Sequence, residues 1–396
     1  MFYGLASSSW GQEEIEAVRR TIESGRVTMG EEVSSFEQEF ARYFGMRYGV
    51  MTNSGSSALT LALAALELPS GSEVITPACT FATTVAPIVQ QNLVPAFVDV
   101  VIDSFQIDPD KIEDLITPRT KAMMVPNLIG NLPDWPRLRA IAEAHDLHLI
   151  EDSADTIGSL IDGAPTGELS DASTTSFYAS HVITCCGFGG MACFSRPDLA
   201  RRAQLLRGWG RRSALTGETE SVEDRFLGSI DGIDYDAKFT FDAVGYNFLP
   251  SEIGAAFGLE QLKKLESYIV ARVHNFTKLT KFFEAYEEWL VLPRQMANVR
   301  TAWLALPLIV RDSAPFSRRD LQMHFESAGV QTRPIFSGNI LRHRGFSKIQ
   351  SRVSERGYAN ADQVMRGGIL LGCHQGMTEP DTNYICDVFQ QLVRRY

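Results

Sequence analysis

Short apolar segments alternate with helical ones between residues 48 and 152, and this order limits the possible folds more than any other feature of the sequence. The strand-like segments are residues 48–52, 72–77, 94–100, 121–127 and 147–152, and the helix-like segments between them are residues 56–66, 83–91 and 135–145. Parallel strands that are joined by helices bury both faces of their sheet. The alternation therefore predicts an α/β fold built on a large, mixed but mostly parallel sheet.

The last third of the chain has a different pattern. Residues 248–290 form a long and nearly uninterrupted helical pattern, and strand-like residues 301–310 precede helix-like residues 317–329 and 380–393. A chain of 396 residues suits one large domain and a smaller one. We expect a large cofactor-binding α/β domain over residues 1–255, including the N-terminal helices, and a small α+β domain over residues 256–396 that begins with the long helix.

Composition and charge exclude several classes of function. The formal net charge of −11 argues against nucleic acid or an anionic membrane as the main partner. No apolar run approaches the roughly 20 residues of a membrane-spanning helix, and the N-terminus lacks the features of a signal peptide. We therefore expect a cytosolic protein.

The cysteines do not form a metal-binding pattern. The six are Cys79, Cys185, Cys186, Cys193, Cys373 and Cys386, and no CxxC pair occurs among them. A zinc ribbon is therefore not expected, and a cluster on the three central cysteines would lack a fourth nearby ligand. We interpret the cysteines as mostly buried thiols of a reducing compartment.

A small-residue turn follows the first strand of the alternating region. Gly55, Ser56 and Ser57 stand between that strand and the start of a helix. Backbone N–H groups and the positive end of the helix dipole suit a phosphate at such a place, and the hydroxyls add donors. A plain serine N-cap is the alternative interpretation.

Two further strand ends carry candidate side chains. Asp152 ends an apolar strand, and ligands of open α/β sheets lie beyond the carboxyl ends of the strands. A carboxylate there can keep a pyridine nitrogen protonated. Phe81 also follows a strand, and its ring can stack on an aromatic ligand. Each residue has an alternative interpretation when it is taken alone. Asp152 can be an acidic helix cap, and Phe81 can be a core residue.

The segment SFYASH, residues 176–181, leads from a buried strand into a glycine-rich turn. Together with the phosphate turn, Phe81 and Asp152, it resembles the DegT/DnrJ/EryC1/StrS family of sugar aminotransferases, which use pyridoxal phosphate on the fold-type I scaffold. The likeness spans nearly the whole chain and includes TMGEEVSSFEQEFARYFG and GYNFLPSEIGAAFGLEQLKKL. It implies that position 181 would normally hold the lysine that binds the cofactor covalently.

Position 181 is a histidine here, and no lysine occurs between Lys121 and Lys238. The resemblance is therefore to the histidine-containing branch of the family, the 3-dehydratases of nucleotide-linked 4-keto-6-deoxyhexoses. Some of these enzymes bind an iron–sulfur cluster through cysteines after the motif WGR. Here that segment reads GWGRRSALTGETESVEDRF, without cysteine. The resemblance is closer to the cluster-free enzymes of this branch, which implies that no iron–sulfur cluster is bound and that the substrate is GDP-4-keto-6-deoxymannose.

The branch implies a particular chemistry. An imidazole forms no lasting bond with the cofactor aldehyde, so the cofactor is expected to be held non-covalently, favouring pyridoxamine phosphate. L-glutamate would supply its amine, and the amine would condense with the C4 ketone of the sugar. His181 would remove a proton from the cofactor, since an ordinary imidazole pKa lies near about 6.5. Loss of the C3 hydroxyl and hydrolysis would then give a 3-deoxy-4-keto sugar and ammonia.

The resemblance also assigns supporting roles to several residues. Ser176 would bind the cofactor phosphate, and Asp155 would bond the ring hydroxyl. Asn247 would reach the phosphate of a partner subunit, which implies a homodimer with shared active sites. Asn339 and Arg342 are candidates for contact with the sugar or its diphosphate, with loop structure as the alternative. His374 reads more simply as a buried loop histidine.

Three alternatives remain open from the sequence. The first is an aminotransferase of the same family with an unusual base. The second is a non-catalytic sensor that binds a nucleotide sugar or the cofactor, in which His181 is structural. The third, a lysine replaced by engineering, does not explain the branch-like sequence elsewhere.

Overall fold

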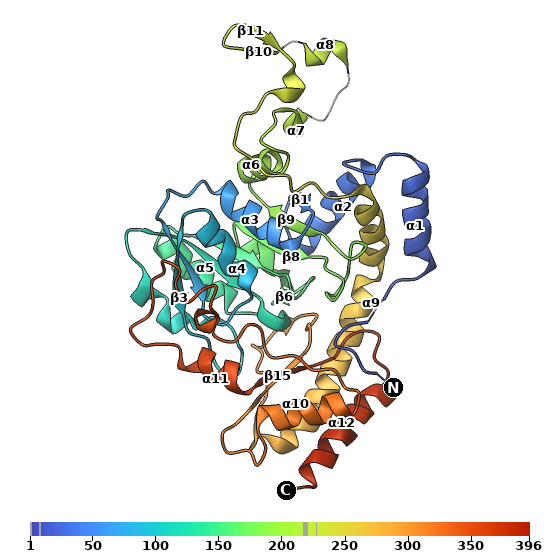
Figure 1. Ribbon diagram of the computed structural model, residues 1–396, viewed down its shortest axis with the longest axis vertical. Helices are drawn as coiled ribbons and strands as arrows, with labels where there is room; N and C mark the ends of the chain where they lie inside the picture. Colours follow the sequence, from blue (N-terminus) through green and yellow to red (C-terminus); the bar gives the residue numbers. More distant parts are fainter. Residues whose placement is uncertain (1, 8, 217–220, 227) are drawn as a thin grey trace.

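A seven-stranded sheet organises the larger part of the chain in the computed structural model, which describes residues 2–7, 9–216, 221–226 and 228–396 (Figure 1). Its spatial order is β1 (Tyr48–Thr52), β9 (Gly190–Phe194), β8 (Ala172–Ser176), β5 (His148–Asp152), β4 (Thr120–Pro126), β2 (Glu73–Pro77) and β3 (Val94–Val98). Strand β9 runs antiparallel to β1 and β8, and the other neighbours are parallel. The predicted mostly parallel sheet is confirmed.

Helices cover both faces of this sheet because every second side chain of a strand points to the same face. Ala122 and Met124 of β4 pack under the layer of α3 (Gly55–Ala65), α4 (Ala82–Gln90) and α6 (Pro197–Arg207). Met123 and Val125 pack under α5 (Trp135–Ala144) on the opposite face. Helix α2 (Glu31–Ala41) covers β1 and β9 on that same side. Burial on both faces makes most of these strands apolar along their length, whereas the buried strand β8 has the sequence Ala-Ser-Thr-Thr-Ser.

Helix α9 (Glu252–Phe283) connects the sheet domain to the C-terminal elements. It begins at Glu252 because the Ser251 side chain accepts a hydrogen bond from the Gly254 amide. Its first half packs in the core with α2, and its second half packs in a separate core with the C-terminal elements. The domain boundary at residues 255–256 stays a prediction, since one helix belongs to both cores.

The C-terminal core surrounds a small antiparallel sheet. Its strands are β12 (Leu290–Val291), β14 (Leu306–Val310) and β15 (Gly368–Leu371), and its helices are α10 (Arg318–Ser327), α11 (Ala359–Gly367) and α12 (Glu379–Val393). The first residues of the chain also pack here, because Tyr3 stacks on Tyr384 with ring centroids 4.7 Å apart. A second small sheet consists of β6 (Leu160–Ile161), β7 (Ala164–Pro165) and β13 (Val299–Arg300).

Two peripheral features complete the fold. Helix α1 (Gln12–Glu23) lies along α9, and residues 208–216, 221–226 and 228–247 form an arm that projects from the body beyond α6 (Figure 1). The arm contains α7 (Ser213–Thr216), α8 (Val222–Arg225) and the hairpin of β10 (Gly228–Ile230) with β11 (Ile233–Tyr235). Among the described residues, no helix combines the length and the apolar character needed to cross a membrane.

Candidate active site

A cavity of about 470 Å³ opens at the carboxyl ends of the central strands. Pro126, Asp152 and Ser176, the last residues of β4, β5 and β8, all line it. These ends coincide because the strands are parallel and in register, with Pro126 paired to Asp152 and Asp152 to Thr174. The cavity therefore lies where α/β sheets usually bind their ligands.

Strand alternation separates the two adjacent carboxylates at the end of β5. Asp152 faces the cavity, where it accepts hydrogen bonds from the Thr84 hydroxyl at 2.7 Å and the Ala154 amide at 3.1 Å. Glu151 faces away, into a buried network in which Asn127 and Ser173 donate to it. Asp152 is thus the carboxylate that can meet a ligand, and Glu151 holds the strand ends together.

Burial raises the pKa of Asp152 to about 6, against the bonds from Thr84 and Ala154, which act to lower it. Burial likewise raises the pKa of Asp155 to about 7, and the amide of Ile129, which donates to it at 2.7 Å, acts in the opposite direction. A cationic ring nitrogen beside Asp152 would offset the cost of burying its charge. The cavity therefore favours a ligand with a protonated nitrogen at this end.

His181 lies in the loop after β8, half-buried in the cavity wall. Its Nδ1 lies 3.1 Å from the Ser176 carbonyl oxygen, and because a carbonyl only accepts, Nδ1 carries the hydrogen. Nε2 then holds the free lone pair. Burial lowers the pKa of His181 to about 4; the Ser176 bond opposes this, and the charge of Arg272 adds to it. The imidazole is therefore neutral at pH 7, with one nitrogen able to accept a proton.

A close approach of three segments builds the phosphate turn. A Cβ on Gly55 would lie 2.4 Å from the Cβ of Ser176, and a Cβ on Gly190 would lie 2.4 Å from the Ser54 carbonyl oxygen. Only glycine therefore allows the start of α3 to lie against β8 and β9. Ser54, Gly55, Ser56 and Ser176 line the cavity together, so the helix N-terminus and three hydroxyls face one end of it.

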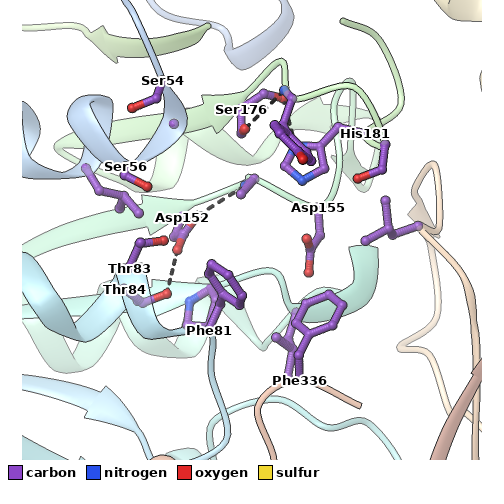
Figure 2. Close-up of a pocket in the computed structure, with 18 of the residues that line it drawn as sticks. Ser54, Ser56, Phe81, Thr83, Thr84, Asp152, Asp155, Ser176, His181 and Phe336 are labelled. Carbon is purple, nitrogen blue, oxygen red and sulfur yellow. Dashed lines mark hydrogen bonds between the residues drawn. The ribbon is translucent and has the colours of Figure 1, made fainter. Parts of the chain in front are cut away.

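Aromatic side chains form the opposite wall. Phe81 is 50% exposed although it lines the cavity, and it meets Phe336 edge-on with ring centroids 5.9 Å apart. Figure 2 shows Phe81 beside Thr84 and Asp152, with His181 across the cavity. A flat ring bound between Phe81 and His181 would cover apolar surface that is otherwise open to water.

The structure brings together most of the residues that the sequence singled out. Those that line the cavity are Gly55, Ser56, Phe81, Asp152, Asp155, Ser176 and His181. Ser57 does not line it, because its hydroxyl donates to the Asn53 side chain at 2.6 Å. Their roles toward a ligand stay predictions, but their meeting at one cavity is a property of the fold.

Three other candidate residues lie outside this cavity. Asn247 pairs with Gly208 at the root of the arm, next to Phe248, whose carbonyl accepts the Asn53 amide. Asn339 and Arg342 both donate to the carboxylate of Asp362, at 2.8 and 3.0 Å. These contacts hold both side chains in a loop, where Asn339 is buried and Arg342 stays exposed.

His374 is part of the backbone packing rather than of the cavity. Its Nε2 donates to the Gly4 carbonyl at 3.1 Å, and its Nδ1 accepts from the Gly376 amide at 3.2 Å. Burial lowers its pKa to about 4. Both ring nitrogens are therefore used within the chain, as expected for a structural histidine.

Several cavity residues escaped the sequence reasoning. They are Ser54, Leu59, Thr83, Thr84, Pro126, Leu128, Ala154, Tyr178, Ser180, Phe188, Gly189, Leu304 and Phe336. Thr84 had a usable signal, because it stands in the first turn of a helix that follows a strand end. Leu304 and Phe336 had none, since they come from distant segments that only the folded chain brings to the cavity.

The donor set fits a phosphorylated pyridine. The helix N-terminus with its serines suits the phosphate, Phe81 suits the ring face, and Asp152 suits the ring nitrogen. Among the lining residues, all of them in the described part of the chain, none is lysine or arginine. The cavity therefore offers a base, His181, but no primary amine.

A family model described as the DegT/DnrJ/EryC1/StrS aminotransferase family matches residues 8–390 of the chain. The chain is 35% identical to the dTDP-4-dehydro-2,6-dideoxy-D-glucose 3-dehydratase of Saccharopolyspora spinosa, over 93% of this chain and 82% of that protein. It is 33% identical to the GDP-4-keto-6-deoxy-D-mannose 3-dehydratase of Yersinia pseudotuberculosis, over 94% of each chain.

A solved structure shows the same fold. The Escherichia coli GDP-4-keto-6-deoxy-D-mannose-3-dehydratase with bound hydrated PLP superposes with a TM-score of 0.89. The match covers 98% of this chain and 99% of that one, at 30% sequence identity. The fold-type I scaffold expected from the sequence is thereby confirmed.

Proposed function

The chain belongs to the DegT/DnrJ/EryC1/StrS aminotransferase family, and on this premise we propose that it is a 3-dehydratase of a nucleotide-linked 4-keto-6-deoxyhexose. The family and its relatives make it a pyridoxal-phosphate-dependent, sugar-modifying enzyme. The observation that carries the finer proposal is the neutral imidazole of His181 in the cavity wall, where no lysine is present among the described lining residues.

Pyridoxamine phosphate, when bound, supplies an amine for the C4 ketone of the sugar and a ring that withdraws electrons. The turn of Ser54, Gly55 and Ser56, together with Ser176, would hold its phosphate, and Phe81 would pack on the ring. Asp152 would hold the proton on the ring nitrogen, because Thr84 and Ala154 fix its carboxylate at the end of β5.

His181 moves the protons in this proposal. Its Nδ1 is fixed on the Ser176 carbonyl, so Nε2 is the atom of His181 that would accept a proton from a bound ligand. An imidazolium with a low pKa gives its proton up readily, so the same atom suits protonation of the departing C3 hydroxyl. A histidine also cannot capture the cofactor aldehyde, whereas a lysine amine could.

The remaining features extend the proposal. L-glutamate is the proposed amino donor, and GDP-4-keto-6-deoxymannose is the proposed substrate. The protein is proposed to work as a homodimer in which Asn247 reaches the cofactor phosphate of the second subunit. The described lining residues offer hydroxyls and a helix N-terminus but no cation, so a further donor from a second subunit would complete the binding of a phosphate or diphosphate.

Product analysis tests the function. The protein is incubated with pyridoxal phosphate, L-glutamate and a panel of GDP-, dTDP- and CDP-linked 4-keto-6-deoxy sugars, and ammonia and product mass are followed. The proposal predicts ammonia and a 3-deoxy-4-keto sugar, with the GDP sugar preferred. An amino sugar would instead support the aminotransferase, and no turnover with any sugar would support a non-catalytic binding protein. The panel includes dTDP sugars because a relative at 35% identity is named for one.

A further inference from the structure

A surface pocket in the C-terminal part of the chain collects three arginines. It has a volume of about 360 Å³ and lies between the end of β14, the start of α10 and the end of α11. Arg311, Arg318 and Arg366 line it, and we call it the arginine pocket. It shares no lining residue with the cofactor cavity, and its volume lies within the usual range of small-molecule sites. The arginine pocket is therefore a separate place where a charged ligand can bind.

Close packing of α11 against β14 brings Arg366 to this pocket. A Cβ on Gly367 would lie 2.5 Å from the Val310 carbonyl oxygen, so only a glycine after Arg366 lets the end of α11 lie this close to the end of β14. Arg311 follows β14 directly, and Arg318 is the first residue of α10. Three structural elements thus present one arginine each to the same pocket.

The backbone holds the guanidinium group of Arg311 in place. Its Nε donates to the Glu287 carbonyl oxygen at 2.9 Å and to the Leu290 carbonyl oxygen at 3.3 Å. These contacts use one of the five N–H donors of the guanidinium and leave the four terminal ones for a ligand. The group is therefore oriented before a ligand binds, which reduces the entropy lost on binding.

The arginine pocket keeps its positive charge. Among the described residues, none of its three arginines forms an ion pair with an aspartate or a glutamate. Asp362 on α11 senses the charge of Arg366, yet its carboxylate binds Arg342 and Asn339 instead. The one carboxylate among the lining residues belongs to Asp312, which is exposed. In a chain with a formal net charge of −11, this pocket is a local exception that attracts anions.

The start of α10 adds to this positive potential. Asp320 closes the first turn of the helix, because its carboxylate accepts from the Ser317 amide at 2.9 Å and from the Ser317 hydroxyl at 2.7 Å. The amides of Arg318 and Arg319, the first two helical residues, have no partner within the helix. Asp320 offsets part of the helix dipole, so the arginines supply most of the attraction.

We propose that the arginine pocket binds a phosphate monoester. A dianionic phosphate group offers three terminal oxygens and two charges, which suit several guanidinium groups at once, whereas a carboxylate offers two oxygens and one charge. Ala314, Pro315 and the amide side chain of Gln363 also line the pocket, and they would contact the uncharged body of the ester. The proposal is independent of the proposed dehydratase reaction, because it uses none of the residues of the cofactor cavity.

Isothermal titration calorimetry on the full chain tests this binding. The protein is first loaded with one equivalent of pyridoxamine phosphate, so that the cofactor cavity does not take up the probe. Glucose 6-phosphate and guanosine monophosphate are the two probes, because they distinguish a sugar phosphate from a nucleotide. At least one should bind with a stoichiometry of one per chain and a Kd below about 1 mM, at least about 10-fold more tightly than acetate. Saturable binding of neither ester, or equally tight binding of acetate, would overturn the proposal.

Paired variants place the ester in the pocket. Arg318→Gln and Arg366→Gln should each weaken the binding at least about 10-fold, the usual result of removing a charge-assisted hydrogen bond. Arg319→Gln is the matched control, because Arg319 is exposed on the same helix but does not line the pocket. Its affinity should stay within about twofold of the unmodified protein, since salt screens a more distant charge. Circular dichroism checks that each variant is folded. Equal affinities of the Arg318→Gln and Arg319→Gln variants would show that the ester binds elsewhere and would contradict the proposal.

Discussion

The two cavities that meet at His181 differ in almost every other respect. The cofactor cavity contains two buried carboxylates and several hydroxyls at strand and helix ends. A second cavity of about 390 Å³ lies between α1, α9 and the loop after β8, and we call it the α1 groove. Apart from His181 and the thiol of Cys186, it is lined by aliphatic, aromatic and uncharged polar side chains. The first cavity thus presents fixed carboxylates and hydroxyls, whereas the second presents apolar side chains with a few uncharged polar ones between them. The comparison teaches that the loop after β8 separates a cavity with ionisable groups at strand ends from one that is almost uncharged, with His181 in the wall of both.

The largest expected effect comes from the residue that the two cavities share. His181→Asn keeps an amide that can donate to the Ser176 carbonyl but provides no base. We expect kcat for ammonia release to fall by about 100- to 10,000-fold, the usual contribution of a general base. Binding of pyridoxamine phosphate, followed by absorbance, should change little. A variant with more than a tenth of the normal kcat would show that another group moves the proton.

On the groove side, Lys264→Met should remove the partner of a buried charge. Glu14 would stay buried without its ammonium, so the free energy of unfolding should fall by about 3 kcal/mol in urea titrations. Lys263→Met is the matched control, because Lys263 is exposed and pairs only with Glu260 at 2.8 Å on the surface. In that control, the free energy of unfolding should fall by less than about 0.5 kcal/mol. Equal losses in the two variants would mean that Glu14 does not orient α1.

On the cofactor side, burial of Asp155 predicts a pH-dependent stability. The folded protein holds the Asp155 proton more tightly than the unfolded chain does, since its pKa is raised to about 7. The resulting stability is complete below the ordinary carboxyl pKa of about 4 and is lost as pH rises through about 7. Asp155→Asn imitates the protonated acid and does not lose this stability as the pH rises. Without cofactor, the free energy of unfolding of the variant should therefore rise relative to that of the unmodified protein by about 2–3 kcal/mol from pH 5 to pH 8.

Urea unfolding at the two pH values measures this difference. The exposed residue Asp162 provides the control, and Asp162→Asn should show the same small effect at both pH values. An Asp155→Asn effect that is equal at pH 5 and pH 8 would mean that the carboxyl is not protonated in the folded, cofactor-free chain.

The smallest expected effect concerns the ring wall. Phe81→Ala should weaken the binding of pyridoxamine phosphate about 3- to 30-fold, because the ring loses its aromatic neighbour. Phe81→Trp keeps a flat apolar face and should stay within about threefold of the unmodified protein. Fluorescence titration with the cofactor measures both. Equal affinities for the two variants would place the ring elsewhere in the cavity.

The comparison also explains what the sequence could reveal. Asp152 and His181 were predictable because parallel strands bring their carboxyl ends together, so polar residues after strands indicate a site. The placement of Ser57 was not predictable from the sequence. Its hydroxyl contacts the side chains of Asn53 and Ser54 at the start of α3 and does not line the cavity. Asn339 and Arg342 depend on a contact with Asp362 that only the folded loop creates.

The α1 groove could not be predicted from the sequence at all. The periodic pattern of residues 11–25 indicates a helix with an apolar stripe, and such a stripe normally faces the core. The ion pair between buried Glu14 and half-buried Lys264 reverses this expectation, and the two residues are 250 positions apart. Local patterns thus predicted the helix correctly but could not give its rotation.

The central claim is that an imidazole, rather than an amine, faces the cofactor. Borohydride reduction of the protein with pyridoxal phosphate, followed by intact-mass spectrometry, tests it most directly, with His181→Lys as the positive control. The account predicts an unchanged mass for the unmodified protein and the added mass of one reduced cofactor for His181→Lys. A cofactor fixed to the unmodified chain would contradict it.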